Sequence, residues 1–174
     1  LTSRIVLDAN IYTMNNRAEA FWMKKGILGD TVPLELNAKE LVHRNNKNSE
    51  LTVYGYTPMM VSVQCVQKTM DHCNHACVQY VLKDRYQKEF RGVCSCEFCY
   101  NTIYNTLPTS LLKEKEKAEK LGVKAYRLSF TIETQQETEK IVRAFVDVYL
   151  RGQKPDGQMQ TEETTKGHFQ RGVE

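Results

Sequence analysis

The feature that most restricts how this chain can fold is the clustering of its cysteines. All six lie between Cys65 and Cys99 of a 174-residue chain. Gathered thiols can ligate a soft metal or an iron–sulfur cluster, form disulfides in a small secreted domain, or pack as small apolar groups. The chain is longer than most disulfide-dependent secreted domains, so we expect the cysteines to bind a metal or a cluster.

The composition does not identify a binding partner. The net charge of +3 and the isoelectric point near 8.5 do not predict nucleic-acid binding by themselves. The sequence contains neither a run of 18 apolar residues nor the pattern of a signal peptide, and we therefore expect a cytoplasmic protein. The chain begins within an apolar run and without Met, so we expect it to be a segment of a longer protein.

Outside the cysteine region, short apolar runs alternate with helical patterns. The runs predict strands at residues 5–7, 31–36, 51–54 and 125–130, and the helical patterns lie at 16–26, 37–43, 110–121 and 134–152. Three of the helices begin with a cap and a glutamate three residues later: Asn16 with Glu19, Asn37 with Glu40, and Thr134 with Glu137. Alternation of this kind predicts an α/β fold with a mainly parallel sheet.

The cysteine region is predicted to be an insert at residues 61–105, within a β/α unit at residues 1–152. Residues 80–83 and 89–93 can pair as a hairpin, held by Asp84 and Arg85 and closed by Ile103 and Tyr104. Residues 153–174 are expected to form a polar linker and a C-terminal tail.

Four parallel strands are about half of an eight-stranded β/α barrel, which needs roughly 250 residues. An open doubly wound sheet is the alternative. In both folds ligands bind at the carboxyl ends of the strands. Polar residues near the predicted strand ends are therefore candidates for a site: Asp8, Asn10, Glu35, Tyr54, Arg127 and Glu133.

Among these candidates we select Arg127, Glu35 and Glu133 as substrate-binding residues. Arg127 can pair with a small anionic substrate such as a carboxylate or a phosphate. The structural alternative is that Glu35 and Arg127 form a buried ion pair with each other.

Several separated motifs resemble the U32 peptidase family, the collagenase-like proteins. They are VPLELNAKEL, LTVYGYTPMMVSVQC, the Asp84–Arg85 pair, CEFCYNTIYN, GVKAYRLSFTIE and GHFQRGVE, and together they extend over about residues 5–174. The resemblance implies that the chain is the C-terminal half of a TIM-like β/α barrel, completed by the N-terminal half of the same protein. It also implies either peptidase activity or cluster-dependent hydroxylation of RNA or a small aromatic substrate, since some members carry a four-cysteine [4Fe–4S] cluster.

The cysteine spacing supports one ligand pair directly. A CxxC turn points two sulfurs the same way, which makes Cys96 and Cys99 the best pair. The family resemblance adds Cys65 and Cys73. Cys77 and Cys94 remain as spare or substitute ligands, Zn²⁺ can replace the cluster, and His72 or His75 can replace a cysteine.

Three functions remain as alternatives: a cluster-dependent hydroxylase, a peptidase acting on collagen-like substrates, and a structural unit stabilised by zinc that is inactive alone. The catalytic residues are unknown, because neither HExxH nor GxSxG occurs. Phe98, Tyr100 and Tyr104 can stack an RNA base or pack around the cysteine loops. Exposed strand edges make a homodimer a further hypothesis.

Overall fold

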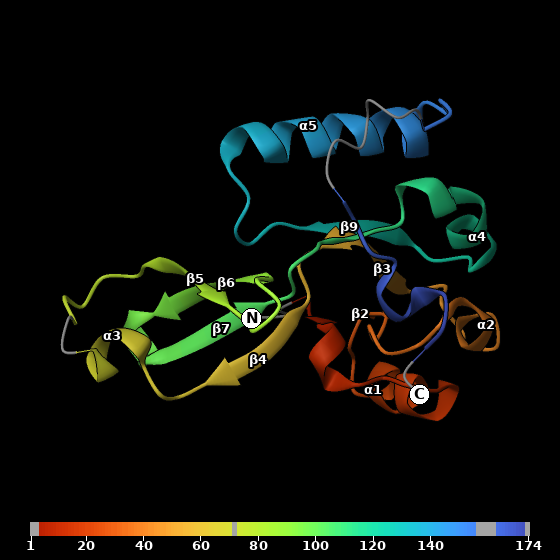
Figure 1. Cartoon of the computed structure of the whole chain (residues 1–174). Helices are drawn as coiled ribbons and strands as arrows, with labels where there is room; N and C mark the ends of the chain where they lie inside the picture. Colours follow the sequence, from red (N-terminus) through yellow and green to blue (C-terminus); the bar gives the residue numbers. More distant parts are fainter. Residues whose placement is uncertain (1–3, 71–72, 156–162, 173–174) are drawn as a thin grey trace.

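The computed structural model describes residues 4–70, 73–155 and 163–172. It contains two open sheets joined at the end of one long strand (Figure 1). The larger sheet is mostly parallel and is accompanied by helices, whereas the smaller one is antiparallel and projects to one side. The prediction of a mixed α/β protein is confirmed at this level.

Four strands of the larger sheet are parallel, and their order in space follows their order in the chain. They are β1 (Val6–Leu7), β2 (Gly29–Thr31), β3 (Ser49–Gly55) and β9 (Ala125–Ser129). A fifth strand, β8 (Thr109–Ser110), pairs antiparallel with the end of β3. Helical crossovers explain this order, because parallel neighbours cannot be joined by tight turns.

The helices beside the larger sheet follow the predicted alternation, and a further short helix lies in the cysteine region, where none is predicted. They are α1 (Asn16–Lys24), α2 (Ala38–Leu41), α3 (Val66–Thr69), α4 (Lys115–Lys120) and α5 (Gln135–Phe145), the last continued by a π-helical segment at Val146–Leu150. Short 3₁₀ turns lie at Ala9–Ile11, Cys96–Phe98, Leu112–Glu114 and Gly167–Phe169. Among the described residues, we find no helix whose length and apolar content would let it cross a membrane.

Two of the three predicted capping boxes are confirmed. In α2, the Asn37 side chain accepts from the backbone N–H of Glu40, and the Glu40 carboxylate accepts from the backbone N–H of Asn37. Thr134 and Glu137 do the same for α5.

The third predicted cap is wrong by one residue. Asn15 caps α1, because its side chain accepts from the N–H groups of Arg17 and Ala18, both at 3.0 Å. Asn16 instead accepts from the N–H of Asn45 at 2.6 Å, and Glu19 accepts from the Asn45 side chain.

Two predicted elements are also wrong in extent. The strand expected at residues 31–36 is β2, which ends at Thr31; Val32 still bonds to Glu50, but Pro33 has no N–H to continue the ladder. The helix expected at residues 110–121 begins only at Lys115. Ser110 and Leu111 are held by backbone bonds to Thr165 and Val53, so they extend the sheet instead.

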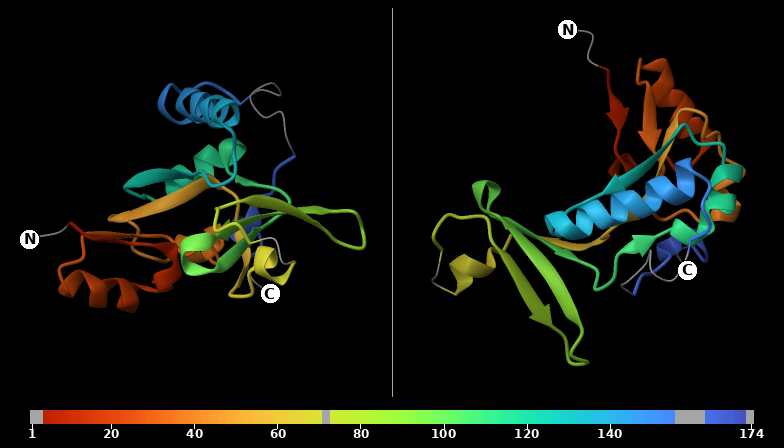
Figure 2. Two further views of the ribbon diagram at one scale, coloured as in Figure 1. Left: turned by 90° about the vertical axis from the view of Figure 1, so that its left-hand side faces the viewer. Right: turned by 90° about the horizontal axis from the view of Figure 1, so that it is seen from above.

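The main core lies between the parallel sheet and the helices. In the view from above, α5 runs over β3 and β9 (Figure 2). Aromatic rings fill this contact: Tyr54 of β3 meets Phe130 at 5.5 Å and Phe145 at 6.1 Å, and Tyr126 of β9 meets Tyr149 at 4.7 Å. The predicted helical spacing after Thr134 therefore corresponds to a face that is buried on the sheet.

The described part of the C-terminal segment is attached to this core. Phe169 is buried in it, and Thr165 forms a parallel bridge with Thr109. Lys166 pairs with Glu114, which also pairs with Lys117. Most of the predicted polar linker, at residues 156–162, lies outside the described residues.

The Glu114 pairs give a first testable prediction. Burial alone would raise the pKa of Glu114, but Lys117 and Lys166 hold it below its ordinary value of 4.5. A lowered pKa stabilises the fold above the ordinary value, and this stabilisation is lost as the pH falls through the folded value. We expect Glu114→Gln to lower the free energy of unfolding by about 1.5–3 kcal/mol at neutral pH.

Urea denaturation from about pH 7 to about pH 3 measures this effect, and the difference from wild type should shrink toward acid pH. Glu119→Gln is the matched control, because that carboxylate is half exposed and lies 3.5 Å from Lys115. Equal effects of the two variants would contradict the prediction.

A buried polar network joins β2, β3 and the end of α2. Arg44 and Asp30 form an ion pair whose side chains are 2% and 1% exposed. Arg44 also donates to the backbone oxygen of Thr13 at 2.8 Å and to the side chains of Asn46 and Ser49, both at 2.9 Å. Ser49 donates to the second oxygen of Asp30 at 2.6 Å.

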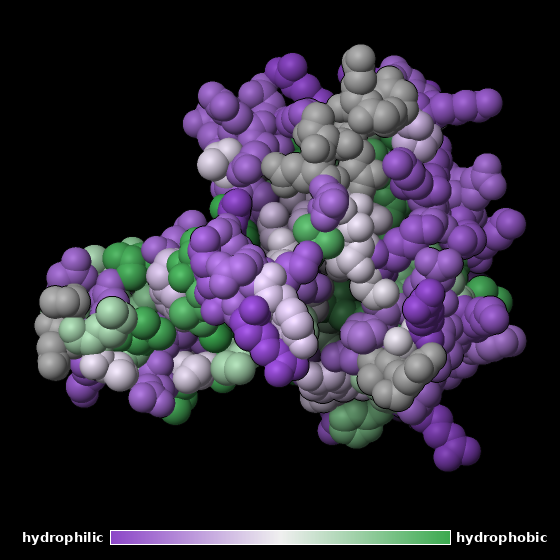
Figure 3. All heavy atoms as spheres, in the orientation of Figure 1, coloured by the Kyte–Doolittle hydropathy of each residue, from purple (hydrophilic) through white to green (hydrophobic). Residues whose placement is uncertain are grey.

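The smaller sheet contains the cysteine region. Its strands are β4 (Pro58–Ser62), β5 (Gln79–Lys83), β6 (Glu89–Ser95) and β7 (Tyr100–Tyr104), in the order β4-β7-β6-β5. The predicted hairpin is β5–β6, and Asp84 holds its turn by accepting from the N–H groups of Tyr86 and Lys88. Many apolar side chains of the smaller sheet are exposed, and they are visible as green spheres on the projecting part of the molecule (Figure 3).

Candidate metal centre

The antiparallel sheet brings cysteines together from three segments. Cys94 lies on β6, and Cys96 begins the 3₁₀ turn that follows it. Cys65 follows β4 and immediately precedes α3. Cys73 and His75 lie in the loop between α3 and β5.

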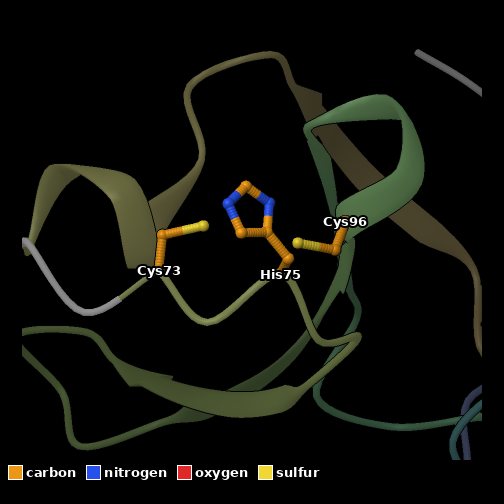
Figure 4. A group of neighbouring side chains, drawn as sticks. All are labelled: Cys73, His75 and Cys96. Atoms are coloured by element: carbon orange, nitrogen blue, oxygen red, sulfur yellow. The ribbon is translucent and has the colours of Figure 1, made fainter.

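Cys73, His75 and Cys96 form a group that can hold a metal ion. Their ligand atoms, two sulfurs and one ring nitrogen, all lie within 4.8 Å of one another. Figure 4 shows the three side chains pointing toward a common centre, with the imidazole between the two thiols. Cys96 is buried, whereas Cys73 and His75 are exposed and accessible to an entering ion.

A second pair of thiols is buried beside this group. The sulfurs of Cys65 and Cys94 are 3.6 Å apart, and these two residues and Cys96 form one buried cluster with Val78 and Tyr80 packed against it. Cys99 is exposed, and its thiol lies 3.7 Å from the backbone oxygen of Cys96. Cys77 is also exposed, and His72 lies outside the described residues.

The electrostatics of these thiols depend on burial and on one another. Burial is the largest cause, and the neighbouring Cys65 the next, of a pKa of Cys94 that is raised to about 12. The pKa of Cys96 is also raised, mainly by burial and secondly by the neighbouring Cys73. A hydrogen bond from the backbone of Lys68 is the main cause of the lowered pKa of Cys65. A bound cation reverses these increases, because a coordinated thiol is deprotonated.

The donor set therefore fits a soft or borderline metal. Thiolates and imidazole are ligands for zinc and for iron–sulfur clusters, whereas magnesium and calcium prefer oxygen. Of the four predicted ligands, Cys73 and Cys96 are in the three-residue group. Cys65 lies against Cys94 next to it, and Cys99 follows Cys96 by three residues.

A second concentration of polar residues lies across the parallel strands, beside the carboxyl ends of β1 and β2. Arg127 of β9 donates through Nη1 to Asp8 at 3.1 Å and to Thr31 at 3.0 Å, and the same nitrogen is 4.0 Å from Glu50. These residues come from all four parallel strands or their ends. Arg127, Asp8 and Asn10 also line a cavity of about 420 Å³.

The other candidates are placed differently. The ion pairs of Arg127 within the described residues are with Asp8 and Glu50, so the suggested pair with Glu35 is not the one observed; Glu35 is half-buried. Glu133 accepts from the backbone N–H groups of Thr131 and Ile132 through Oε2. Its Oε1 is buried without a partner among the described residues, beside a small cavity of about 60 Å³. Tyr54 is buried in the core.

The aromatic candidates of the cysteine region are partly exposed. Phe98, which is 69% exposed, stacks on Tyr100 with a centroid distance of 6.4 Å. Burial and a nearby Thr131 hydroxyl act on Tyr104 in opposite directions, and burial dominates, so its pKa is raised.

Sequence reasoning underestimated His75 and Cys94. The sequence indicates His75 only as a possible replacement for a cysteine, but its ring lies beside the thiols of Cys73 and Cys96, and its backbone is left-handed with φ of 56°. Cys94 was a spare thiol, yet it is fully buried between Cys65 and Cys96. The signal available for Cys94 was its CxC spacing with Cys96, because alternate residues of an extended chain point to the same side.

Comparisons with protein-family models, with curated proteins and with solved structures found no match for this chain.

Proposed function

We propose that the protein uses its cysteine-rich sheet to bind a metal ion or an iron–sulfur cluster. The observation that carries this proposal is the convergence of Cys73, His75 and Cys96 within 4.8 Å. Two more thiols, Cys65 and Cys99, are available to complete four thiolate ligands, as a [4Fe–4S] cluster needs. Cys94, packed against Cys65, is the substitute.

The spacing favours a second candidate, a structural zinc site. In a tetrahedral site with Zn–S distances of about 2.3 Å, neighbouring sulfurs lie about 3.8 Å apart. The observed separations of up to 4.8 Å are close to that value. In a cubane cluster each cysteine binds a different iron, so the sulfurs lie further apart, and the Cys73 loop would have to move outward. His75 is therefore a ligand if the site holds zinc, and it is not a ligand if the site holds a cluster.

The resemblance to the U32 family supports a catalytic role for the larger protein. We propose cluster-dependent hydroxylation of RNA or a small aromatic substrate, with the four parallel strands forming half of a β/α barrel. Barrel strands follow one another in chain order, as β1, β2, β3 and β9 do. Ile5, Val6 and Leu28 at the β1 edge are each about half exposed, which suits a covering β/α unit from the N-terminal half. Peptidase activity remains the alternative implied by the family name.

Metal analysis tests the binding proposal. Protein prepared without oxygen should contain about four irons and four sulfides if the site holds a cluster, and about one zinc if it holds a structural ion. We expect Cys73→Ser and Cys96→Ser to lose most of the metal. Cys77→Ser is the matched control, because Cys77 is exposed and lies outside the group.

His75→Ala separates the two candidates, since it should reduce zinc content and leave a cluster unchanged. Retention of full metal content by both Cys73→Ser and Cys96→Ser would contradict the proposal. Peptidase activity, the alternative implied by the family name, is tested with denatured collagen as the substrate of the longer protein. If cleavage persists in the Cys73→Ser variant, a peptidase site outside the cysteine region is favoured.

A further inference from the structure

A cavity of about 420 Å³ lies where the parallel strands end, and the cysteine ligands are not among its lining residues. Its walls come from the ends of β1, β3 and β9, from the segment after β2, and from residues 165–169 near the C-terminus. Cavities of about 300–1,000 Å³ are the usual size of small-molecule sites. The carboxyl ends of parallel strands are also where such ligands bind in α/β folds.

Arg127 is the charged group best placed to receive a ligand there. Thr31 and Asp8 hold its guanidinium, and the hydrogen bonds that it makes to described residues all use Nη1. Its side chain remains 41% exposed. The other guanidinium N–H groups are thus available, and their planar arrangement matches the two oxygens of a carboxylate or a phosphate.

The neighbouring charges limit how much negative charge the ligand can carry. Asp8 on the cavity wall opposes Arg127, and Glu50 is 4.0 Å from it. Lys166 and His168 also line the cavity, but Lys166 is already paired with Glu114. A ligand with one negative charge at the Arg127 end therefore matches the site better than a polyanion does.

The remaining walls select the body of the ligand. Leu34, Leu36 and Met59 line the cavity and present apolar surface. Binding sites for small molecules commonly combine such walls with a few placed polar groups. A small organic acid with a ring or a short aliphatic body satisfies both the apolar walls and the guanidinium.

We propose that this cavity binds a small organic monoanion, with Arg127 contacting its carboxylate or phosphate and with Asp8 and Thr31 positioning the guanidinium. The inference concerns a site separate from the cysteines, and it does not depend on which metal they hold. The C-terminal segment at residues 165–169 forms one wall, so ligand binding should protect the backbone amides of this segment from exchange.

Titration calorimetry with benzoate, methyl phenyl phosphate, inorganic phosphate and the neutral benzamide tests the proposal. Methyl phenyl phosphate is a diester, so like benzoate it carries one negative charge, and we expect one of these two anions to bind the wild-type chain and benzamide to bind at least about tenfold more weakly. A preference for benzoate would identify a carboxylate ligand, and a preference for methyl phenyl phosphate a phosphate diester. Inorganic phosphate should bind more weakly than both, because it lacks the apolar body.

Arg127→Gln should weaken anion binding by about tenfold or more, and Arg127→Lys should give an intermediate loss because it keeps the charge but not the fork. Arg143→Gln is the matched control, since Arg143 is 75% exposed on α5 and pairs with Glu139. Circular dichroism and metal content should be the same in all variants. Equal binding of benzoate and benzamide, unchanged binding by Arg127→Gln, or no anion binding to the folded wild type would each overturn the inference.

Discussion

Replacing Arg44 by methionine should lower the free energy of unfolding by about 3–5 kcal/mol. The Arg44 and Asp30 side chains are 2% and 1% exposed, so the substitution leaves a carboxylate buried without its cation. It also removes donors to Thr13, Asn46 and Ser49, which connect the start of α1, the end of α2 and β3. Urea denaturation followed by circular dichroism measures the loss.

The control for this prediction is Arg143→Met on α5. Its partner Glu139 is exposed, and we expect a change of less than about 0.5 kcal/mol. The double variant Asp30→Asn with Arg44→Met should recover part of the loss, because the buried negative charge is then absent. If Arg44→Met and Arg143→Met had similar effects, the network would not stabilise the fold as argued.

The elements that sequence reasoning located correctly are those with local signals. The capping boxes at Asn37 and Thr134 depend on residues three apart, and the hairpin turn depends on Asp84 bonding to residues two and four further on. The parallel arrangement followed from the alternation of strands and helices, because short loops cannot join parallel neighbours.

The elements that it located wrongly depend on distant partners. Asp30 was not expected in a strand, since an acidic residue there is costly until Arg44, fourteen positions later, neutralises it. Ser110 and Leu111 have good helical spacing with Leu121, but their N–H groups bond to Thr165 and Val53. No local pattern contains these long-range bonds.

The difference between local and long-range signals also explains which residues of the cysteine site were predicted. The CxxC spacing of Cys96 and Cys99 is a local signal, and it identified Cys96. The approach of His75 to Cys96 is set by the path of the loop before β5, which no spacing rule describes. Likewise, the contact of Cys65 with Cys94 joins the segment after β4 to β6, and β4 and β6 are not neighbours in the sheet because β7 lies between them.

Removing the metal that we propose for the cysteine site should unfold the antiparallel sheet while leaving the parallel sheet intact. Among the residues that the structure describes, the buried cluster of this sheet consists of three cysteines with only Val78 and Tyr80 packed against it, both partly buried. Met59, Met60, Val61 and Val63 are each more than half exposed, so they contribute little to a core. We therefore expect the fold of this sheet to depend on the proposed metal, because the free energy of metal binding then contributes to the free energy of folding.

Hydrogen exchange before and after treatment with a chelator and a reducing agent measures this effect. We expect amides of β6 and β7 to exchange about 100-fold faster, which corresponds to roughly 2.8 kcal/mol at about 1.4 kcal/mol per factor of ten. Amides of β3 and β9 should change little, because their core of aromatic and aliphatic residues contains no cysteine. The effect should be reversed by adding the metal back at neutral pH and should weaken in acid, where protons compete for the thiolates.

Cys73→Ser should mimic the chelator, since it removes a ligand from an exposed loop without opening a cavity in the core. Cys77→Ser should respond to the chelator as the wild type does. This pair of variants separates metal coordination from packing, because a cysteine that only packs stabilises the fold through burial, and Cys73 and Cys77 are both exposed. If replacing Cys73 lowers the protection of β6 and β7, a bound metal is therefore required to explain the loss. If chelation leaves the protection unchanged, the proposal is contradicted, and the buried thiols hold the sheet together as apolar groups.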